Sequence, residues 1–223
     1  RRPPRSPLFP YTTLFRSQSD SGMLAIVGNL TTNYAGRTLT LQGAGNGSIE
    51  GSIQDGLTVG LPVIKKGIGT WTLAGTTSNT YTGTTSVQRG LLILDKTDAV
   101  AVPATLNVGD GSGDDSFVRL AGSGDNQIAD TAAVYVFKGE TLDLNGRNEA
   151  IDLLVRGTTG SSSRSPVVTN QAAGTTATLT VGAAGGSAGF LGSISDGAGQ
   201  VALVKSGTGT FTVMDDYAYS GPT

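Results

Sequence analysis

The sequence contains no cysteine and no histidine. The first absence excludes disulfides and thiol nucleophiles, and the two together exclude Cys/His zinc sites. Without histidine the chain also lacks the side chain that most often acts as a general base near neutral pH. Most familiar enzyme mechanisms have no residue to act through, so we expect a protein that is not an enzyme and has no cofactor.

Charged residues are also scarce, at 14% of the chain. The net charge is −2, but four of the arginines fall within residues 1–17, where no acidic residue occurs. The other 11 basic residues are opposed by 17 acidic ones, so the rest of the chain carries a charge near −6. Nucleic acids and anionic lipids bind clustered Lys and Arg, so neither is an expected partner. Direct membrane insertion is not expected either, because no segment of the sequence approaches the roughly 18 apolar residues that a membrane span needs.

Residues 1–17 differ from everything that follows, because they contain four prolines and four arginines. A secretory signal peptide needs an apolar stretch of about 7 to 15 residues, and Pro7, Pro10 and the pair Thr12-Thr13 interrupt this one. The segment is similar to a translated linker peptide, and a disordered arm is the alternative. We therefore place a boundary after residue 17 and expect the folded body to span residues 18–223.

Glycine is abundant, with 34 residues, and the sequence repeats itself over a long distance. Three blocks recur in the same order: residues 51–56 at 192–197, 63–73 at 203–213, and 81–83 at 219–221. The nearly constant spacing defines one long unit of roughly 140 residues, with small deletions in its turns, and such repetition indicates a repeat architecture. We call residues 51–83 the first copy and residues 192–221 the second copy.

Apolar and polar residues alternate with a period of two inside this unit, as in residues 70–73 and 142–144, which is typical of half-buried strands. Asn-Gly and Asp-Gly pairs separate these short strands and supply the positive φ that sharp turns require. A sandwich would show longer strands, and a propeller would repeat roughly every 40 to 50 residues. The sequence therefore predicts an all-β solenoid with coils of about 20 to 25 residues.

Certain residues recur in both copies and carry a family resemblance. They are Gly67, Gly69, Trp71, Leu73, Tyr81 and Gly83 in the first copy, and Gly207, Gly209, Phe211, Val213, Tyr219 and Gly221 in the second. This pattern resembles the autotransporter-associated β-strand repeat, with its Gly-x-Gly-Thr-aromatic-Thr-Leu strand, its Asn-Thr-Tyr-Thr-Gly turn and its Thr-Val…Gly-x-Leu strand. The resemblance implies a right-handed parallel β-helix in the passenger of an autotransporter-like bacterial protein.

The same resemblance implies a location at the cell surface or outer membrane, or secretion, and a role as a non-catalytic stalk or adhesin. The implied partners are the surface of a host or neighbouring cell, glycans, or other copies of the chain. The 223 residues contain neither a signal peptide nor a translocator barrel, so we expect them to be a fragment of a longer protein. Alternation turns Trp71 and Phe211 into the core, on the same side as Leu73 and Val213.

The densest acidic cluster lies at Asp110, Asp114 and Asp115. It partly fits the glycine- and aspartate-rich pattern of calcium-binding β-rolls. A β-roll completes the oxygen shell of each ion from two stacked turns, and this sequence has a single copy of the pattern. We therefore expect a solvated turn without a metal.

A groove on the outer face is the alternative site. Alternation places Arg119, Tyr135, Asp143 and Asp152 on that face, where outward polar residues are also what any solvated strand carries. A glycosidase needs two carboxylates about 5 to 9.5 Å apart, which Asp143 and Asp152 would supply if their coils aligned. A carbohydrate-active β-helix enzyme, either a polysaccharide lyase or a hydrolase, is therefore one alternative to a stalk, and a carbohydrate-binding module is another.

Overall fold

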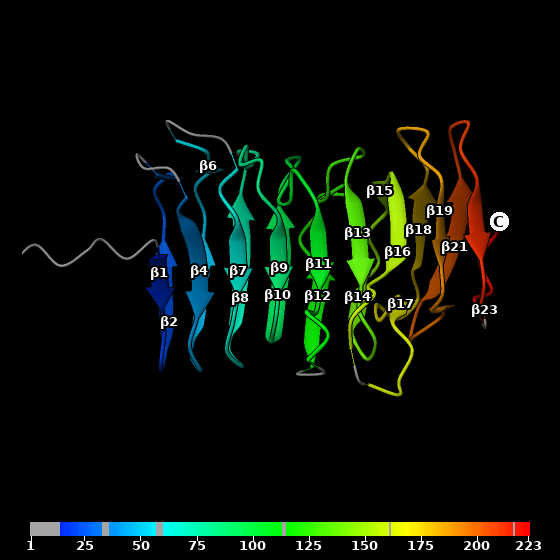
Figure 1. Cartoon of the computed structure of the whole chain (residues 1–223), viewed down its shortest axis with the longest axis horizontal. Helices are drawn as coiled ribbons and strands as arrows, with labels where there is room; N and C mark the ends of the chain where they lie inside the picture. Colours follow the sequence, from blue (N-terminus) through cyan, green and yellow to red (C-terminus); the bar gives the residue numbers. More distant parts are fainter. Residues whose placement is uncertain (1–13, 33–35, 57–59, 113–114, 161, 216) are drawn as a thin grey trace, which may run out of the picture.

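A computed structural model describes residues 14–32, 36–56, 60–112, 115–160, 162–215 and 217–223. Every regular element in these ranges is a β-strand, and the paired strands run parallel. The strands stack along one long axis as a solenoid of about eight turns, with the chain end at residue 223 at one tip (Figure 1). The predicted all-β solenoid of parallel strands is confirmed.

Two long sheets form two faces of the solenoid. The seven-stranded sheet contains β1 (Leu14–Gln18), β4 (Thr38–Gln42), β7 (Val63–Lys65), β9 (Thr85–Val87), β11 (Leu106–Val108), β13 (Ala133–Val136) and β16 (Leu153–Arg156). The nine-stranded sheet contains β2 (Met23–Ile26), β5 (Asn46–Ile49), β8 (Thr70–Gly75), β10 (Gly90–Lys96), β12 (Ser116–Leu120), β14 (Thr141–Asp143), β17 (Val167–Thr169), β20 (Ser193–Ser195) and β23 (Tyr217–Ala218).

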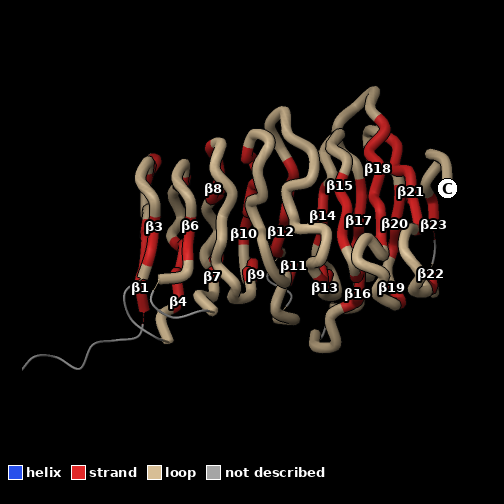
Figure 2. Tube along the Cα trace, turned by 90° about the horizontal axis from the view of Figure 1, so that it is seen from above, coloured by secondary structure: helices blue, strands red, loops and turns tan. Residues whose placement is uncertain are grey.

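Shorter sheets complete the coils. They are β3 (Leu30–Thr31) with β6 (Ile53–Gln54), β15 (Glu149–Ile151) with β18 (Thr176–Val181) and β21 (Gln200–Lys205), and β19 (Ala188–Phe190) with β22 (Phe211–Val213). Tan turns link the strands of successive coils (Figure 2). Between β6 and β15 the coils lack regular strands on this third side, where the described residues form one isolated bridge from Val102 to Ile128.

Neighbouring strands within a sheet come from successive coils. On the seven-stranded sheet Leu39 pairs with Val63, Val63 with Thr85, and Leu106 with Val134. The last of these steps spans more of the chain than the first two, and its additional residues lie in the turns. Each face therefore keeps its register while the coil length varies, and a coil exceeds the predicted length where a turn is long.

Strand β1 begins at Leu14 and pairs with β4 along its whole length. The boundary expected after residue 17 thus falls within this strand, and residues 1–13 of the expected arm lie outside the described residues. The open edge of a parallel sheet presents unpaired N–H and C=O groups. A neighbouring segment can satisfy these groups with its backbone whatever its composition.

Columns of inward side chains fill the interior. Ile49, Leu73, Leu94 and Leu120 occupy one column of the nine-stranded sheet, paired strand to strand and all at most 1% exposed. Trp71 is the largest of the fully buried side chains and fits because its partner in the preceding coil is Gly47. A Cβ at that glycine would lie 2.7 Å from the indole ring.

Buried polar side chains replace part of the backbone ladder on the third side. Asn79 accepts a hydrogen bond from the Ile53 N–H (2.8 Å) in the preceding coil and donates one to the Ala101 carbonyl (2.7 Å) in the following coil. Glu149 accepts from the backbone N–H of Gln127 (2.8 Å) and of Ile128 (3.2 Å). Backbone groups that have no strand partner here are thereby satisfied.

Trp71 is the only tryptophan in the chain, so its fluorescence reports on the core. Because its side chain is 0% exposed, we expect a blue-shifted emission maximum and weak quenching by iodide. Trp71→Ala should lower the free energy of unfolding in a denaturant titration by about 3 to 5 kcal/mol. Ile68→Ala, at a site 63% exposed, is the control and should change it little. A red emission maximum with free quenching would contradict the packing.

The pH dependence of stability should carry a signature of Glu149. Burial raises the pKa of this carboxyl to about 8, from an ordinary value of 4.5, and outweighs its backbone hydrogen bonds. Because the folded state holds the proton more tightly than the unfolded chain, this contribution to stability is lost as pH rises from about 4.5 to 8.

We expect Glu149→Gln to flatten that part of the slope of unfolding free energy against pH, measured by denaturant titration at several pH values. Asp98→Asn, which removes a carboxyl at an exposed site, is measured in the same way as the control. Parallel slopes for the wild type and Glu149→Gln would show that Glu149 does not titrate in this window.

Candidate functional site

The residues shared by the two copies form the same clasp between successive coils. In the first copy Asp55 accepts hydrogen bonds from the Leu61 N–H (2.8 Å) and from the hydroxyl of Thr82 (2.6 Å), which lies in the next coil. In the second copy Asp196 accepts from the Val201 N–H (2.7 Å) and the Ser220 hydroxyl (2.6 Å). One carboxylate thus fixes its own turn and the turn stacked on it.

The clasps also set the charge state of their carboxyl groups. Burial alone would raise the pKa of Asp55, but the hydrogen bonds from Thr82, Leu61 and Gly60 outweigh it and leave the pKa lowered. At Asp196 the Ser220 hydroxyl is the main cause of a lowered pKa. Both groups are therefore ionised at neutral pH, when each accepts its hydrogen bonds as a carboxylate.

A lysine holds the following turn in each copy. The Lys65 ammonium donates to the carbonyls of Lys66 (3.1 Å) and Gly67 (2.7 Å) in its own turn and of Arg89 (2.8 Å) in the next coil. This side chain is fully buried, and burial lowers its pKa to about 8. Lys205 donates to the carbonyls of Ser206 and Gly207 in the equivalent turn.

The shared glycines lie where two coils approach too closely for a side chain. Gly67 and Gly207 have positive φ values of 74° and 63°. A Cβ at Gly69 would lie 2.0 Å from the Gly45 carbonyl oxygen, and one at Gly209 would lie 2.1 Å from that of Gly186. Gly83 and Gly221 are equally close to the preceding coil, with a Cβ 2.3 Å from the Leu61 and Val201 oxygens, respectively.

The shared aromatic residues have matching positions but differ in burial. Tyr81 shares a hydrogen bond with the Thr85 hydroxyl (2.5 Å), and Tyr219 shares one with that of Thr223 (2.8 Å). Trp71 and Leu73 are fully buried. Phe211 is partly buried and packs against the core, whereas Val213 is 46% exposed in the last described coil.

The contacts of four residues were not predicted from the sequence, although the residues lie within the recurring blocks: Asp55, Asp196, Lys65 and Lys205. The available signal was their identity between the two copies. A carboxylate and a lysine that recur at fixed places among neutral residues mark a repeated contact.

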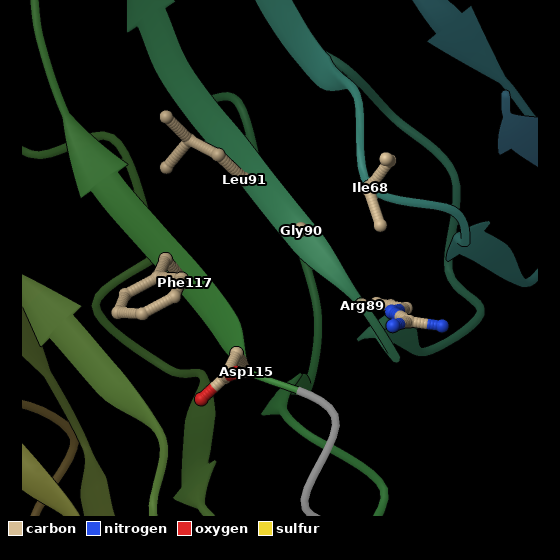
Figure 3. A pocket seen from close by; sticks show the side chains of 6 residues that line it. All are labelled: Ile68, Arg89, Gly90, Leu91, Asp115 and Phe117. Atoms are coloured by element: carbon tan, nitrogen blue, oxygen red, sulfur yellow. The ribbon is translucent and has the colours of Figure 1, made fainter. Parts of the chain in front are cut away.

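A second feature lies on the outer face of the nine-stranded sheet. One depression of about 300 Å³ is lined by Ile68, Arg89, Gly90, Leu91, Asp115 and Phe117, with Leu91 and Phe117 on neighbouring strands (Figure 3). Another of about 380 Å³ is lined by Leu91, Phe117, Val118, Arg119, Thr141, Asp143 and Gln171. The two share Leu91 and Phe117, and we call them together the outer groove.

The outer groove contains two of the four polar residues predicted for an outer-face site. The Arg119 Nε donates to Asp143 at 2.8 Å, across the pair of strands β12 and β14. The other oxygen of Asp143 accepts from the backbone N–H of Asn145 (2.9 Å) and Gln171 (3.0 Å). The carboxylate is 6% exposed and engaged through both oxygens, so its role here is to hold Arg119 in place.

The other two predicted residues lie elsewhere. Tyr135 lies on β13 of the seven-stranded sheet, beside a separate depression of about 300 Å³ that Asn107 and Phe137 also line. Asp152 lies just before β16 and accepts from the Gly186 N–H (2.8 Å). The structure therefore brings Arg119 and Asp143 together and leaves Tyr135 and Asp152 on other parts of the coil.

The acidic turn after β11 forms local contacts. Asp110 accepts a hydrogen bond from the Ser112 N–H (2.9 Å), and the exposed Asp115 lies 3.6 Å from Arg164. Asp114, the third member of the predicted cluster, lies outside the described residues. Across the part of the chain that the structure describes, no group of three or more Asp or Glu residues is placed to hold a metal ion, and no helix could span a membrane.

The parallel coils and the repeated clasp define a β-solenoid repeat protein. Residues 63–94 and 203–223 match the family described as Passenger-associated-transport-repeat. The two matched stretches contain the recurring glycines, lysines and aromatic residues of the two copies, and with the β-solenoid they fit an autotransporter passenger repeat protein. The resemblance inferred from the sequence is therefore confirmed. Comparison with curated proteins and with solved structures found no match.

The clasp predicts a measurable loss of stability. Asp55→Ala leaves the Leu61 N–H and both donors of Thr82 without their acceptor, and the Gly60 N–H keeps the Thr82 hydroxyl oxygen as its acceptor. Hydrogen bonds to a charged group contribute about 1.5 to 3 kcal/mol, so we expect a loss of about 2 kcal/mol in a denaturant titration. Glu50→Ala is the control, because Glu50 is exposed in the same coil. Equal effects of the two substitutions would reject the clasp.

Proposed function

We propose that the chain is part of the non-catalytic extracellular stalk of an autotransporter-like bacterial protein, which presents an adhesive or other functional region at the cell surface. The observation that carries the proposal is that the recurring residues form contacts between successive coils. Asp55 and Lys65 in the first copy, and Asp196 in the second, join one coil to the next. Repetition therefore adds length to a rod.

The family match supports an extracellular location. The matched family is named for the transport of passengers, the parts of autotransporters that are carried across the outer membrane. The absence of cysteine is compatible with this route, because a chain that crosses the periplasm unfolded cannot then be trapped by disulfides. The clasps are made of backbone groups, carboxylates, hydroxyls and amines, which form without a cofactor or a metal.

A carbohydrate-active enzyme is the alternative from another class. Glycoside hydrolysis needs two carboxylates with separate roles. The outer groove is lined by two, Asp143 and Asp115. Asp143 is held by an ion pair and two backbone N–H groups, and Asp115 lies 3.6 Å from Arg164. This arrangement supports a structural role for the pair in preference to acid–base catalysis.

Surface display tests the proposal. The full chain is placed between a signal peptide and an outer-membrane translocator barrel in a Gram-negative host, with an epitope tag at its start. We expect antibody labelling of intact cells and a protease-resistant rod released from the surface. Gly69→Val is the matched control, because its Cβ would collide with the Gly45 carbonyl, and it should yield a chain that protease degrades.

Retention of the tagged chain in the periplasm would contradict the extracellular role. The non-catalytic part is tested on the purified chain, incubated with pectin, alginate and xylan. Formation of unsaturated or reducing sugar ends, abolished by Asp143→Asn, would favour the enzyme.

A further inference from the structure

The outer face of the nine-stranded sheet changes character at β10 and β12. The outward residues of the flanking strands are mostly hydroxyl-bearing: Thr70, Thr72, Thr141, Thr169, Ser193 and Ser195. In the same rows, β10 and β12 place Leu91, Ile93 and Phe117, with Phe117 directly between Leu91 and Thr141 in the register. Large apolar side chains are therefore concentrated on two adjacent strands.

These apolar side chains are accessible to a ligand. Phe117 is 39% exposed and Ile68, in the turn beside β10, is 63% exposed. Figure 3 shows Phe117 and Leu91 side by side on neighbouring strands, with Arg89 and Asp115 toward the start of those strands. An exposed aromatic side chain gives no stability to the rod, whose core lies on the other side of the sheet. A contiguous patch of this kind marks a binding surface.

The polar residues in the second depression of the outer groove are held in place or free to bind a ligand. Asp143 fixes the guanidinium plane of Arg119 through Nε, and the two Nη groups have no partner among the described residues. The Arg119 side chain is nevertheless 44% exposed. Thr141 and the exposed Gln171 line the same depression, and their side chains are not engaged with other described residues. Donors and acceptors in fixed positions thus border the apolar surface formed by Leu91 and Phe117, which we call the floor of the groove.

We propose that the outer groove is a binding site for a neutral saccharide. A pyranose ring has an apolar C–H face and a rim of hydroxyl groups, which match an aromatic floor bordered by fixed polar groups. Phe117 and Leu91 contact the C–H face, and Arg119, Thr141 and Gln171 bind hydroxyls. The groove is lined by two arginines, Arg89 and Arg119, and by two aspartates, Asp115 and Asp143, so its lining has no net charge and favours an uncharged ligand.

The shape of the groove indicates a short oligosaccharide. Its two depressions measure about 300 and 380 Å³, at the small end of the volumes of ligand pockets, and they meet at Leu91 and Phe117. An elongated ligand that crosses the two strands occupies both. Leu91 and Phe117 take no part in the contacts that join the coils, so substitutions there test binding without disturbing the stalk.

The experiment uses the full chain with maltohexaose, cellohexaose and mannohexaose as neutral probes and a hexamer of galacturonic acid as the charged comparison. Binding is measured by calorimetry, and its location by perturbation of the backbone amide signals in NMR spectra. We expect at least one neutral probe to bind more tightly than the charged one, with the largest perturbations on β10 and β12.

Substitutions at the floor and at the rim separate their roles. Phe117→Ala should weaken binding about tenfold, because a stacking contact contributes up to about 1.5 kcal/mol, and Phe117→Tyr should restore it. Arg119→Lys keeps the charge but loses the planar fork, so it should also weaken binding. Ser195→Ala, on the same sheet two strands away from Thr141, is the control and should leave both affinity and melting temperature unchanged.

Four results would overturn the proposal, the last of them a preference for the charged hexamer. The first is the absence of binding by every neutral probe at millimolar concentration, and the second is binding that Phe117→Ala leaves unaltered. The third is a dimer in sedimentation velocity that Phe117→Ala dissociates, since the floor would then be covered by a second copy of the chain. Tighter binding of the galacturonic acid hexamer would exclude a neutral ligand.

Discussion

Hydrogen bonding between successive parallel coils is the constraint on which this structure depends. Parallel strands pair at a spacing of about 4.8 Å, so every turn must close onto the turn below it at that same distance. Where turns meet, the backbone of one coil leaves no space for a side chain on the next, as at Gly69 above Gly45. The Lys65 ammonium and the Asp55 carboxylate then bind the backbone groups that the turns leave unpaired.

The same constraint explains why ionisable side chains are buried although their burial costs free energy of hydration. An interior amine or carboxyl loses its hydration, which shifts the pKa of Lys65 and Glu149 toward the neutral form. Both groups compensate by hydrogen bonds to backbone atoms of more than one segment. Asn79 performs a similar function without a charge by bridging the coils on either side. These hydrogen bonds reinforce the register between coils that the buried apolar face already sets.

The fold could be predicted from the sequence because its signals are local and repeated. Alternation around Trp71 and Leu73, the turn glycines and the long internal repeat are all visible in the sequence alone. The adjacency of Arg119 and Asp143 was not visible, because it depends on the number of residues in the intervening turn. Alternation with a period of two placed Asp143 and Asp152 on the same outer face. The structure places them on different parts of the coil, because their positions also depend on the length of the intervening turns. The apolar floor around Phe117 was not predicted from the sequence, because its surroundings are defined only when three strands are set in register.

The parallel stacking also determines how the rod responds to tension. Hydrogen bonds between coils lie along the rod axis, so a pull on its two ends acts on every interface between coils. A terminal coil has a neighbour on one side alone, so it detaches first and the others follow one after another. Loss of one coil, such as that from Leu39 to Val63, shortens the rod by about 4.8 Å and releases about 80 Å of extended chain. Each clasp adds a barrier to one such step. A short solenoid anchored at both ends is therefore an extensible tether that dissipates mechanical work while its remaining coils stay folded.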